Sequence, residues 1–220
     1  MKREIIQTSD GSSTIYLPEW NEHYHSKFGA IQEAKHVFIK NGLSLFEGTE
    51  IAILEIGLGT GLNAFITFLE AQKSNQTIHY VGIEAYPISD EEIAALNYVN
   101  QLEATEDSLI FEKIHASNWN EQVALSLEFD FTKRKQFFET ITDTNQFDLI
   151  YFDAFGYRVQ PELWSAEIFK AMFNALKEKG VLVTYAARGT IKRNLLEAGF
   201  TVEKLQGPPG KREMFRANKV

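Results

Sequence analysis

Three glycines, Gly57, Gly59 and Gly61, follow the acidic residue Glu55 and precede Asn63. Their G-x-G-x-G spacing differs from the G-x-G-x-x-G pattern that binds the pyrophosphate of a dinucleotide. An acid two residues before the first glycine fits a ligand with a positively charged amino group, such as S-adenosylmethionine. Glycine also permits a positive φ and a close approach to a ligand. We therefore predict that these five residues bind this cofactor; the alternative is a tight strand-to-helix turn that binds nothing.

Further cofactor contacts are expected where two later strands end. Glu84 follows an apolar run over 78–83, at the place where folds of this kind bind ribose hydroxyls. We expect a third strand near 110–114, and the polar residues after it to recognise adenine. The candidates there are Ser117, Asn118 and Trp119. Among them we assign Ser117 to the cofactor.

Asp153 is expected at the carboxyl end of a strand over 147–152, beside the crevice where doubly wound sheets bind ligands. A carboxylate next to the methyl group of the cofactor could hold an amine nucleophile in line and accept its proton. A primary alkylamine must be neutral to attack, so positioning and desolvation would carry most of the effect. We predict that Asp153 is the catalytic residue; the alternative is a cap at the strand end.

Short apolar runs alternate along the chain with stretches of helical spacing. Such runs are typical of strands buried on both faces of a parallel sheet. The expected strands are 51–56, 78–83, 147–152 and 180–185, and the expected helices are 62–73, 90–101, 162–178 and 189–198. This alternation predicts an α/β, doubly wound sheet.

The two ends of the chain depart from this alternation. Residues 200–205 and 212–216, joined by a Gly/Pro-rich turn, predict an antiparallel hairpin. A parallel sheet closed by such a hairpin is the Rossmann-like layout of class I methyltransferases. Near the start, 8–16 predicts a β-turn between short strands and 28–40 a helix. We expect an N-terminal extension over 1–50, packed on the cofactor end of a methyltransferase domain over 51–220.

Composition narrows the classes of function. The 220 residues contain 44% hydrophobic residues and no cysteine, which fits a globular domain and excludes thiolate catalysis and cysteine-ligated metal sites. We expect no metal. The chain has neither a signal-peptide pattern nor an apolar stretch long enough to span a bilayer, so we expect a cytoplasmic protein without membrane contact.

The formal net charge of −8 is unevenly distributed. Residues 151–220 hold 12 Lys and Arg against 7 Asp and Glu, whereas residues 1–150 carry the acidic excess. A phosphate backbone could therefore contact the basic part while the acidic part stays in solvent. From this part we assign three residues to substrate binding: Arg158, Lys211 and Arg212.

Several stretches resemble one known family over nearly the whole chain. They are Thr14-Ile-Tyr16, His23-Tyr24, Gly29-Ala30 with Glu33, Glu55 to Asn63, Asp153-Ala-Phe155 followed by Pro161-Glu-Leu-Trp164, Arg193 to Phe200 and Gly210-Lys-Arg-Glu-Met214. They resemble the tRNA 5-methylaminomethyl-2-thiouridine methyltransferases, which form the methyltransferase part of MnmC and also occur alone as MnmD-type proteins. The glycine loop is generic, whereas the Asp-x-Phe and Gly-Lys-Arg-Glu-Met stretches are specific.

The resemblance implies methyl transfer from S-adenosylmethionine to the aminomethyl group of the wobble uridine in tRNA. It implies that Asp153 faces the amine and that Tyr24 and Gly29 lie near the methionine end of the cofactor. In many members an FAD-dependent oxidase is fused to this part. This sequence ends at Val220, so we expect no FAD and a separate enzyme that supplies the amine.

The chain departs from the family pattern at two places. Tyr157 and Val159 replace a usual proline and a usual basic residue after Asp153, and 129–138 is longer than expected, with a basic triplet that either touches tRNA or is a solvated loop. Other functions remain open: polyamine synthase-like aminopropyl transfer, another small-amine methyltransferase, or an inactive cofactor- or tRNA-binding scaffold. A nicotinamide dehydrogenase fits least, because of the loop spacing.

Overall fold

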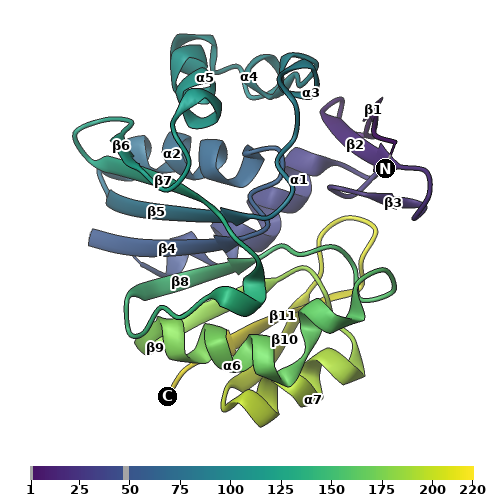
Figure 1. Cartoon of the computed structure of the whole chain (residues 1–220), viewed down its shortest axis with the longest axis vertical. Coiled ribbons are helices and arrows are strands. Elements are labelled where there is room, and N and C mark those ends of the chain that lie inside the picture. The colour runs from purple at the N-terminus through teal and green to yellow at the C-terminus, as the bar shows by residue number, and fades with distance from the viewer. Residues whose placement is uncertain (1, 47–49) are drawn as a thin grey trace.

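The computed structural model describes residues 2–46 and 50–220. Its centre is a sheet of eight strands, in the order β10-β11-β9-β8-β4-β5-β7-β6 (Figure 1). The parallel strands are β4 (Glu50–Ile56), β5 (Thr77–Glu84), β7 (Phe129–Lys135), β8 (Phe147–Phe152) and β9 (Leu176–Thr184). The antiparallel strands are β6 (Gln122–Ala124), β10 (Thr201–Gln206) and β11 (Glu213–Asn218).

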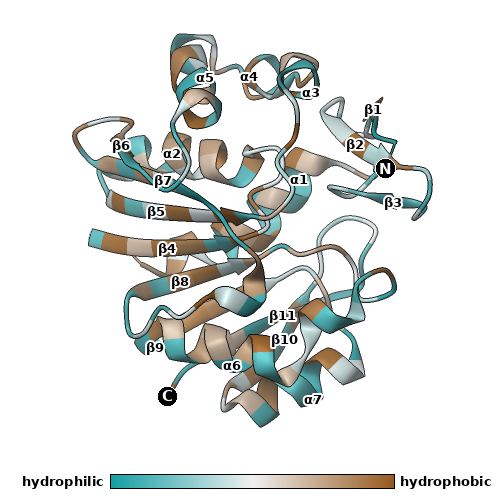
Figure 2. Cartoon of the chain, in the orientation of Figure 1, coloured by the Kyte–Doolittle hydropathy of each residue, from teal (hydrophilic) through white to brown (hydrophobic). Residues whose placement is uncertain are grey.

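Helices cover both faces of this sheet. On one face lie α2 (Leu62–Ser74) and α5 (Ser108–Ala116), which share a hydrophobic core with that side of the central strands. On the other face lie α6 (Ala166–Ala175) and α7 (Gly189–Ala198), which share a second core. Hydrophobic residues gather along the central strands (Figure 2). The sheet is therefore buried on both sides, as its apolar strands predict.

Residues 2–40 contain a small sheet and a helical segment at one end of the large sheet (Figure 1). Strands β1 (Glu4–Gln7), β2 (Ser13–Leu17) and β3 (Glu22–His23) are antiparallel, and α1 (Ala30–Ala34) continues into a π-helical turn over Lys35–Lys40. The predicted turn between short strands is confirmed, as is a helical segment within 28–40. That 1–50 forms a distinct extension stays a prediction, and its end adjoins residues 47–49, which lie outside the described part of the chain.

The four predicted core strands and the C-terminal hairpin are confirmed. Strand β4 pairs in parallel with both β5 and β8, and β8 pairs with β9. The hairpin strands β10 and β11 are antiparallel, and β11 joins the sheet beside β9. Helix α7 ends before Gly199, which has a φ of 112°. The carboxyl ends of β4, β5 and β8 consequently meet at one edge of the sheet.

The predicted third strand near 110–114 is wrong, because these residues lie in α5. Phe111 and Ile114 are buried three residues apart, which is the spacing of a helix face. The strand next to β5 is β7, in which Phe129, Phe131 and Lys133 are buried and the residues between them are not. That period of two is a strand signal. Residues 129–135 are thus part of the sheet and not a loop with a free basic triplet.

Two predicted helices are shorter than expected. The segment 90–101 divides into α3 (Asp90–Ala94), whose N-terminus has a Ser89–Glu92 capping box, and α4 (Tyr98–Gln101). The segment 162–178 divides into a 3₁₀ turn over Pro161–Trp164, α6, and the start of β9. The Ser165 side chain accepts from the Ile168 backbone N–H, so the helix begins only there. Within the described ranges, no helix has the length and apolar character that crossing a membrane requires.

Candidate active site

A cavity of about 870 Å³ lies where the parallel strands end. Its walls include residues that follow β4, β5, β7, β8 and β9. Residues of the N-terminal segment complete the lining: Arg3, Leu17, Trp20, His23, Tyr24 and His25. Because these five strands are parallel, their carboxyl ends lie at the same edge of the sheet. Ligands bind at this edge in doubly wound sheets. The volume is within the usual range for a small-molecule site.

The glycine loop forms the floor of this cavity beside Asp153. Gly57 has a φ of 90°, and a β-carbon there would lie 2.7 Å from the Asp153 carbonyl oxygen. Gly59 has a φ of 51°, and a β-carbon there would lie 3.2 Å from the Tyr24 ring. Only glycine fits both the backbone angle and the space at Gly57. The loop then enters α2 at Gly61.

Glu84, the last residue of β5, is hydrogen-bonded to the glycine loop. Its carboxylate accepts hydrogen bonds from the Gly59 N–H, at 3.0 Å, and from the Tyr86 N–H, at 2.9 Å. Each carboxylate oxygen has a second lone pair, so Glu84 can still accept from ribose hydroxyls. The side chain is half-buried and lines the cavity, as its predicted role requires.

Asp153 follows β8 and lines the cavity with a half-buried carboxylate. Its backbone N–H donates to the Ile56 carbonyl, and its Oδ2 accepts from the Asn63 amide at 2.9 Å. Burial, together with the negative charge of Glu33, raises the pKa of Asp153 to about 7, although Asn63 and Lys211 act in the opposite direction. A carboxylate with this pKa is a proton acceptor suited to neutral pH.

Acidic groups dominate the charged lining of the cavity. Its carboxylates are Glu84, Glu92, Glu139, Asp153 and Glu162, and its basic side chain is Arg3. Arg3 is already in an ion pair with Glu92 at 3.1 Å. Such a lining favours a cationic ligand and disfavours phosphate groups inside the cavity. It suits a sulfonium cofactor and an amine substrate.

Several residues predicted to contact the cofactor lie behind the lining. Glu55 is fully buried, and its carboxylate accepts from the Asn63 amide and the Tyr80 hydroxyl. Gly61 begins α2, and Gly29 begins α1 against the Asp10 carboxylate. The structure does not bring Ser117 to the cavity: it follows α5, and its hydroxyl donates to the Ile114 carbonyl. The prediction that 117–119 recognise adenine assumed a strand at 110–114, and these residues form part of helix α5 instead.

Several aromatic side chains line the cavity together with Asp153, and Trp20, Tyr86 and Phe137 among them were not predicted from the sequence. Tyr24, which was predicted, packs edge-to-face on Phe155 with ring centroids 5.0 Å apart. Trp20 also packs edge-to-face on Phe155, with ring centroids 5.7 Å apart. Tyr86 and Phe137 form a further pair at the rim. Phe137 follows β7, so recognising the period of two in that strand would have placed it at the site.

The three residues assigned to substrate binding have different surroundings. Arg158 donates to the Trp20 and Asn21 carbonyls at 3.1 and 3.0 Å, which ties the loop after Asp153 to the turn between β2 and β3. Lys211 forms an ion pair with Glu33 and lies 3.8 Å from the centroid of the Tyr185 ring. Arg212 is exposed. Of the three, Arg212 is therefore best placed to contact a phosphate.

In the basic triplet of β7, Lys133-Arg134-Lys135, the first lysine is buried and the last is exposed. Lys133 is 5% exposed; its ammonium donates to the His115 carbonyl and lies 4.7 Å from the Trp119 ring centroid. Lys133→Ala should lower the free energy of unfolding by about 1–3 kcal/mol, because the partly buried His115 carbonyl loses its donor and the buried side chain is removed. The neighbouring Lys135 is exposed, and Lys135→Ala should stay within about 0.5 kcal/mol in urea denaturation. Equal effects of the two variants would contradict the buried role of Lys133.

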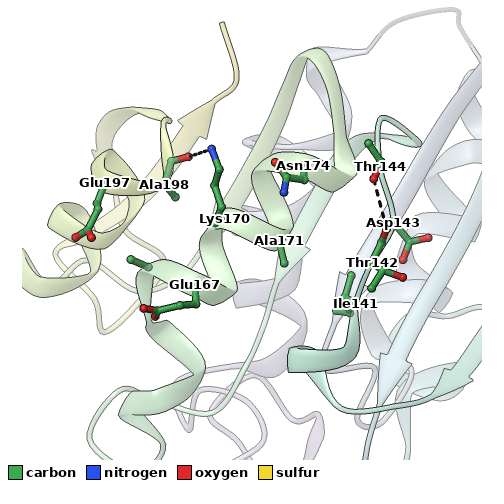
Figure 3. Close-up of a pocket in the computed structure, with 11 residues that line it drawn as sticks. Ile141, Thr142, Asp143, Thr144, Glu167, Lys170, Ala171, Asn174, Glu197 and Ala198 are labelled. Carbon is green, nitrogen blue, oxygen red and sulfur yellow. Dashed lines mark hydrogen bonds between the residues drawn. The ribbon is translucent and has the colours of Figure 1, made fainter.

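A second hollow lies away from this site, between the segment 141–144 and helices α6 and α7 (Figure 3). Asp143 there is in an ion pair with Arg134 at 2.9 Å, and Lys170 donates to the Ala198 carbonyl. Its prominent charged groups are therefore held by protein contacts. Within the described ranges, no group of three or more His, Asp or Glu residues is arranged to hold a metal ion.

The residues of the first cavity fit S-adenosylmethionine. Gly57, Leu58 and Gly59 of the glycine loop line the cavity, and Glu84 offers acceptors at the end of β5. The acidic lining complements the positive charge of a sulfonium. The sheet order and this site together define a class I methyltransferase fold.

Comparison with known proteins agrees with that class. The chain belongs to the S-adenosyl-L-methionine-dependent methyltransferase family, whose model matches residues 98–220. The structure of MnmC2 from Aquifex aeolicus superimposes with a TM-score of 0.79 and 23% identity, covering 98% of this chain and 69% of that one. Spermidine synthase from Thermotoga maritima superimposes with a TM-score of 0.53 and 16% identity, over 98% of this chain and 72% of that one. These likenesses establish the shared fold.

Curated relatives extend the comparison to sequence. The tRNA 5-methylaminomethyl-2-thiouridine biosynthesis bifunctional protein MnmC of Burkholderia multivorans is 32% identical over 92% of this chain and 33% of its own length. The protein of the same name from Burkholderia mallei is 33% identical over 96% of this chain and 34% of its own length. The chain thus spans about a third of the length of the curated relatives it matches.

Proposed function

We propose that this protein transfers a methyl group from S-adenosylmethionine to the 5-aminomethyl group of the wobble uridine, or 2-thiouridine, in tRNA, giving 5-methylaminomethyluridine. One observation carries the proposal: a carboxylate with a pKa near 7, Asp153, lines an acidic cavity beside a glycine loop of the methyltransferase type. The names of the curated relatives support the tRNA substrate. We assign Asp153 as the catalytic residue.

The residues divide the chemistry between them. Bound S-adenosylmethionine supplies an electrophilic methyl group next to a positively charged sulfur. Gly57, Gly59 and Glu84 hold the cofactor. Asp153 accepts a hydrogen bond from the substrate amine, aims its lone pair at the methyl group, and takes the proton that the nitrogen loses when the new N–C bond forms. Tyr24 and Phe155 exclude water around that amine.

The proposed reaction requires partners. An amine must already be present on the uridine, so another enzyme must install the aminomethyl group before methyl transfer. Because tRNA is the substrate, we place the reaction in the cytoplasm. The exposed basic residues of the C-terminal part, such as Arg212 and Arg188, form the phosphate contacts outside the acidic cavity.

A methyl-transfer assay tests the proposal. Purified protein is incubated with methyl-labelled S-adenosylmethionine and tRNA from cells that lack this enzyme but keep the aminomethyl precursor. We expect label in that tRNA and none in tRNA from cells without the precursor. In parallel reactions, putrescine is offered with decarboxylated S-adenosylmethionine. Aminopropylated putrescine without labelled tRNA would favour the polyamine synthase alternative.

Salt dependence tests the phosphate contact. Arg212→Ala should weaken tRNA binding and lower the slope of log affinity against log salt concentration by about 1, because one phosphate contact is lost. Lys135→Ala removes one exposed charge from the opposite half of the sheet and serves as the matched control. Equal slopes for Arg212→Ala and the unmodified protein in filter-binding titrations would remove Arg212 from the interface.

A further inference from the structure

A buried chain of hydrogen bonds runs behind Asp153. Asn63, the second residue of α2, is 3% exposed. Its amide nitrogen donates to Glu55 Oε1 at 2.8 Å and to Asp153 Oδ2 at 2.9 Å. The Tyr80 hydroxyl donates to the other oxygen of Glu55 at 2.8 Å. The two carboxylates that approach this edge from β4 and β8 therefore share a single amide donor.

The orientation of this amide has a cost. Asn63 Oδ1 is buried and has no hydrogen-bond partner within residues 2–46 and 50–220. A buried acceptor without a partner has lost the hydrogen bonds that water would give it, so this orientation is unfavourable for Oδ1 itself. The opposite orientation would place Oδ1 against the oxygens of Glu55 and Asp153, and an ionised carboxylate can only accept. The two carboxylates consequently hold the amide in one orientation, with both N–H groups in use.

We propose that Asn63 is a positioning residue for Asp153, and that Glu55, held by Tyr80, fixes the orientation of the Asn63 amide. Asn63 occupies Oδ2 of Asp153, which leaves the other carboxylate oxygen to accept from a group in the cavity. Rotation of the carboxylate would break the Asn63 bond, so the acceptor keeps one direction. This inference rests on the proposed role of Asp153 in methyl transfer.

The same geometry explains why Glu55 and Asn63 lie behind the cavity lining although they flank the glycine loop in sequence. Both side chains are buried, and both point toward the Asp153 side of the loop through their hydrogen bonds. Each oxygen of Glu55 already accepts one hydrogen bond, from Asn63 or from Tyr80, and the fully buried side chain does not line the cavity. Their effect on the reaction therefore passes through Asp153 and not through a direct contact with S-adenosylmethionine.

Asn63→Leu, which keeps the size but removes the donor, tests the inference. We expect kcat for tRNA methylation to fall by about 10- to 100-fold, the effect of a misdirected catalytic group. The dissociation constant for S-adenosylmethionine, measured by calorimetry, should stay unchanged. Thr67→Val is the matched control, because Thr67 is buried one turn further along α2 and bonds to Tyr151 instead. It should change neither quantity.

A titration of Asp153 gives a second readout that needs no activity. Loss of the Asn63 donor should raise the Asp153 pKa in ¹³C-carboxyl NMR, since that bond favours the ionised form. The other groups that face Asp153 are unchanged in the variant: Glu33 of α1, Lys211 of the hairpin turn, Glu55 of β4 and Tyr185 after β9.

The outcomes separate the inference from the proposed function. Weaker cofactor binding in Asn63→Leu, with an unmoved Asp153 pKa, would overturn the positioning role and make Asn63 a cofactor residue. An unmoved pKa with unchanged binding would overturn it as well. If the unmodified protein methylates no tRNA while Asn63→Leu still raises the Asp153 pKa, the proposed function fails and the hydrogen-bond chain stands.

Discussion

Asp153→Asn is expected to lower methyl transfer by about 100- to 10,000-fold, the usual contribution of a positioned proton acceptor. An asparagine keeps the size of the side chain but cannot take the proton of the amine. Cofactor binding should survive, because the glycine loop and Glu84 are unchanged. Asp148→Asn is the matched control at the other end of β8, where Asp148 accepts from the Ala52 N–H and pairs with Lys177. Full turnover by Asp153→Asn would show that the catalytic assignment is wrong.

The pH dependence of the unmodified protein should agree with this variant. Asp153 must be ionised to accept a proton, so kcat should fall as the pH drops through about 7. The raised pKa also means that the folded protein binds more protons than the unfolded chain between the ordinary aspartate pKa and 7. The free energy of unfolding contributed by this group therefore decreases as the pH rises through that window. Asp153→Asn should remove this decrease, so the inactive variant should unfold at a higher temperature at neutral pH.

Gly57→Ala is expected to have the second large effect, on cofactor binding. A methyl group there would lie 2.7 Å from the Asp153 carbonyl oxygen, and the φ of 90° disfavours any other residue. The left-handed backbone costs about 1–2 kcal/mol before the clash is counted. The loop must move to relieve the clash and the unfavourable φ, so the affinity for S-adenosylmethionine should fall at least about tenfold.

Gly189→Ala is the matched control for that substitution. A β-carbon at Gly189 has nothing within 4 Å, and this residue begins α7 and does not line the cavity. Alanine there should leave cofactor binding unchanged and stabilise the helix slightly. Calorimetric titration of both variants with S-adenosylmethionine measures the difference. Equal affinities would mean that the loop does not contact the cofactor.

The sequence predicted the parts of the fold that short-range patterns determine. Apolar runs located β4, β5, β8 and β9, and Gly199 located the end of α7. It failed at β7, because a lysine occupies the third buried position of that strand. Lys133 looks like a surface residue in a basic triplet, and only its tertiary contacts with His115 and Trp119 explain its burial.

In the site, too, residues located by short-range patterns were predicted, and those that depend on tertiary contacts were not. Asp153, Glu84, Gly57 and Gly59 line the cavity because each follows or ends a parallel strand, and strand ends can be located from sequence. The depth of Glu55 and Asn63 could not be predicted, since it depends on which carboxylates share one amide. The aromatic wall formed by Trp20 and Phe155 joins segments more than a hundred residues apart, which periodicity does not connect.

The most direct test of the central claim is to locate the transferred methyl group. Precursor tRNA is incubated with the protein and S-adenosylmethionine carrying a deuterated methyl group, and its nucleosides are separated and fragmented by mass spectrometry. We expect one deuterated methyl group on the exocyclic nitrogen of the wobble uridine with the unmodified protein and none with Asp153→Asn. A methyl group on a ring atom, on ribose or on another nucleoside, or an unmodified wobble uridine, would contradict that claim.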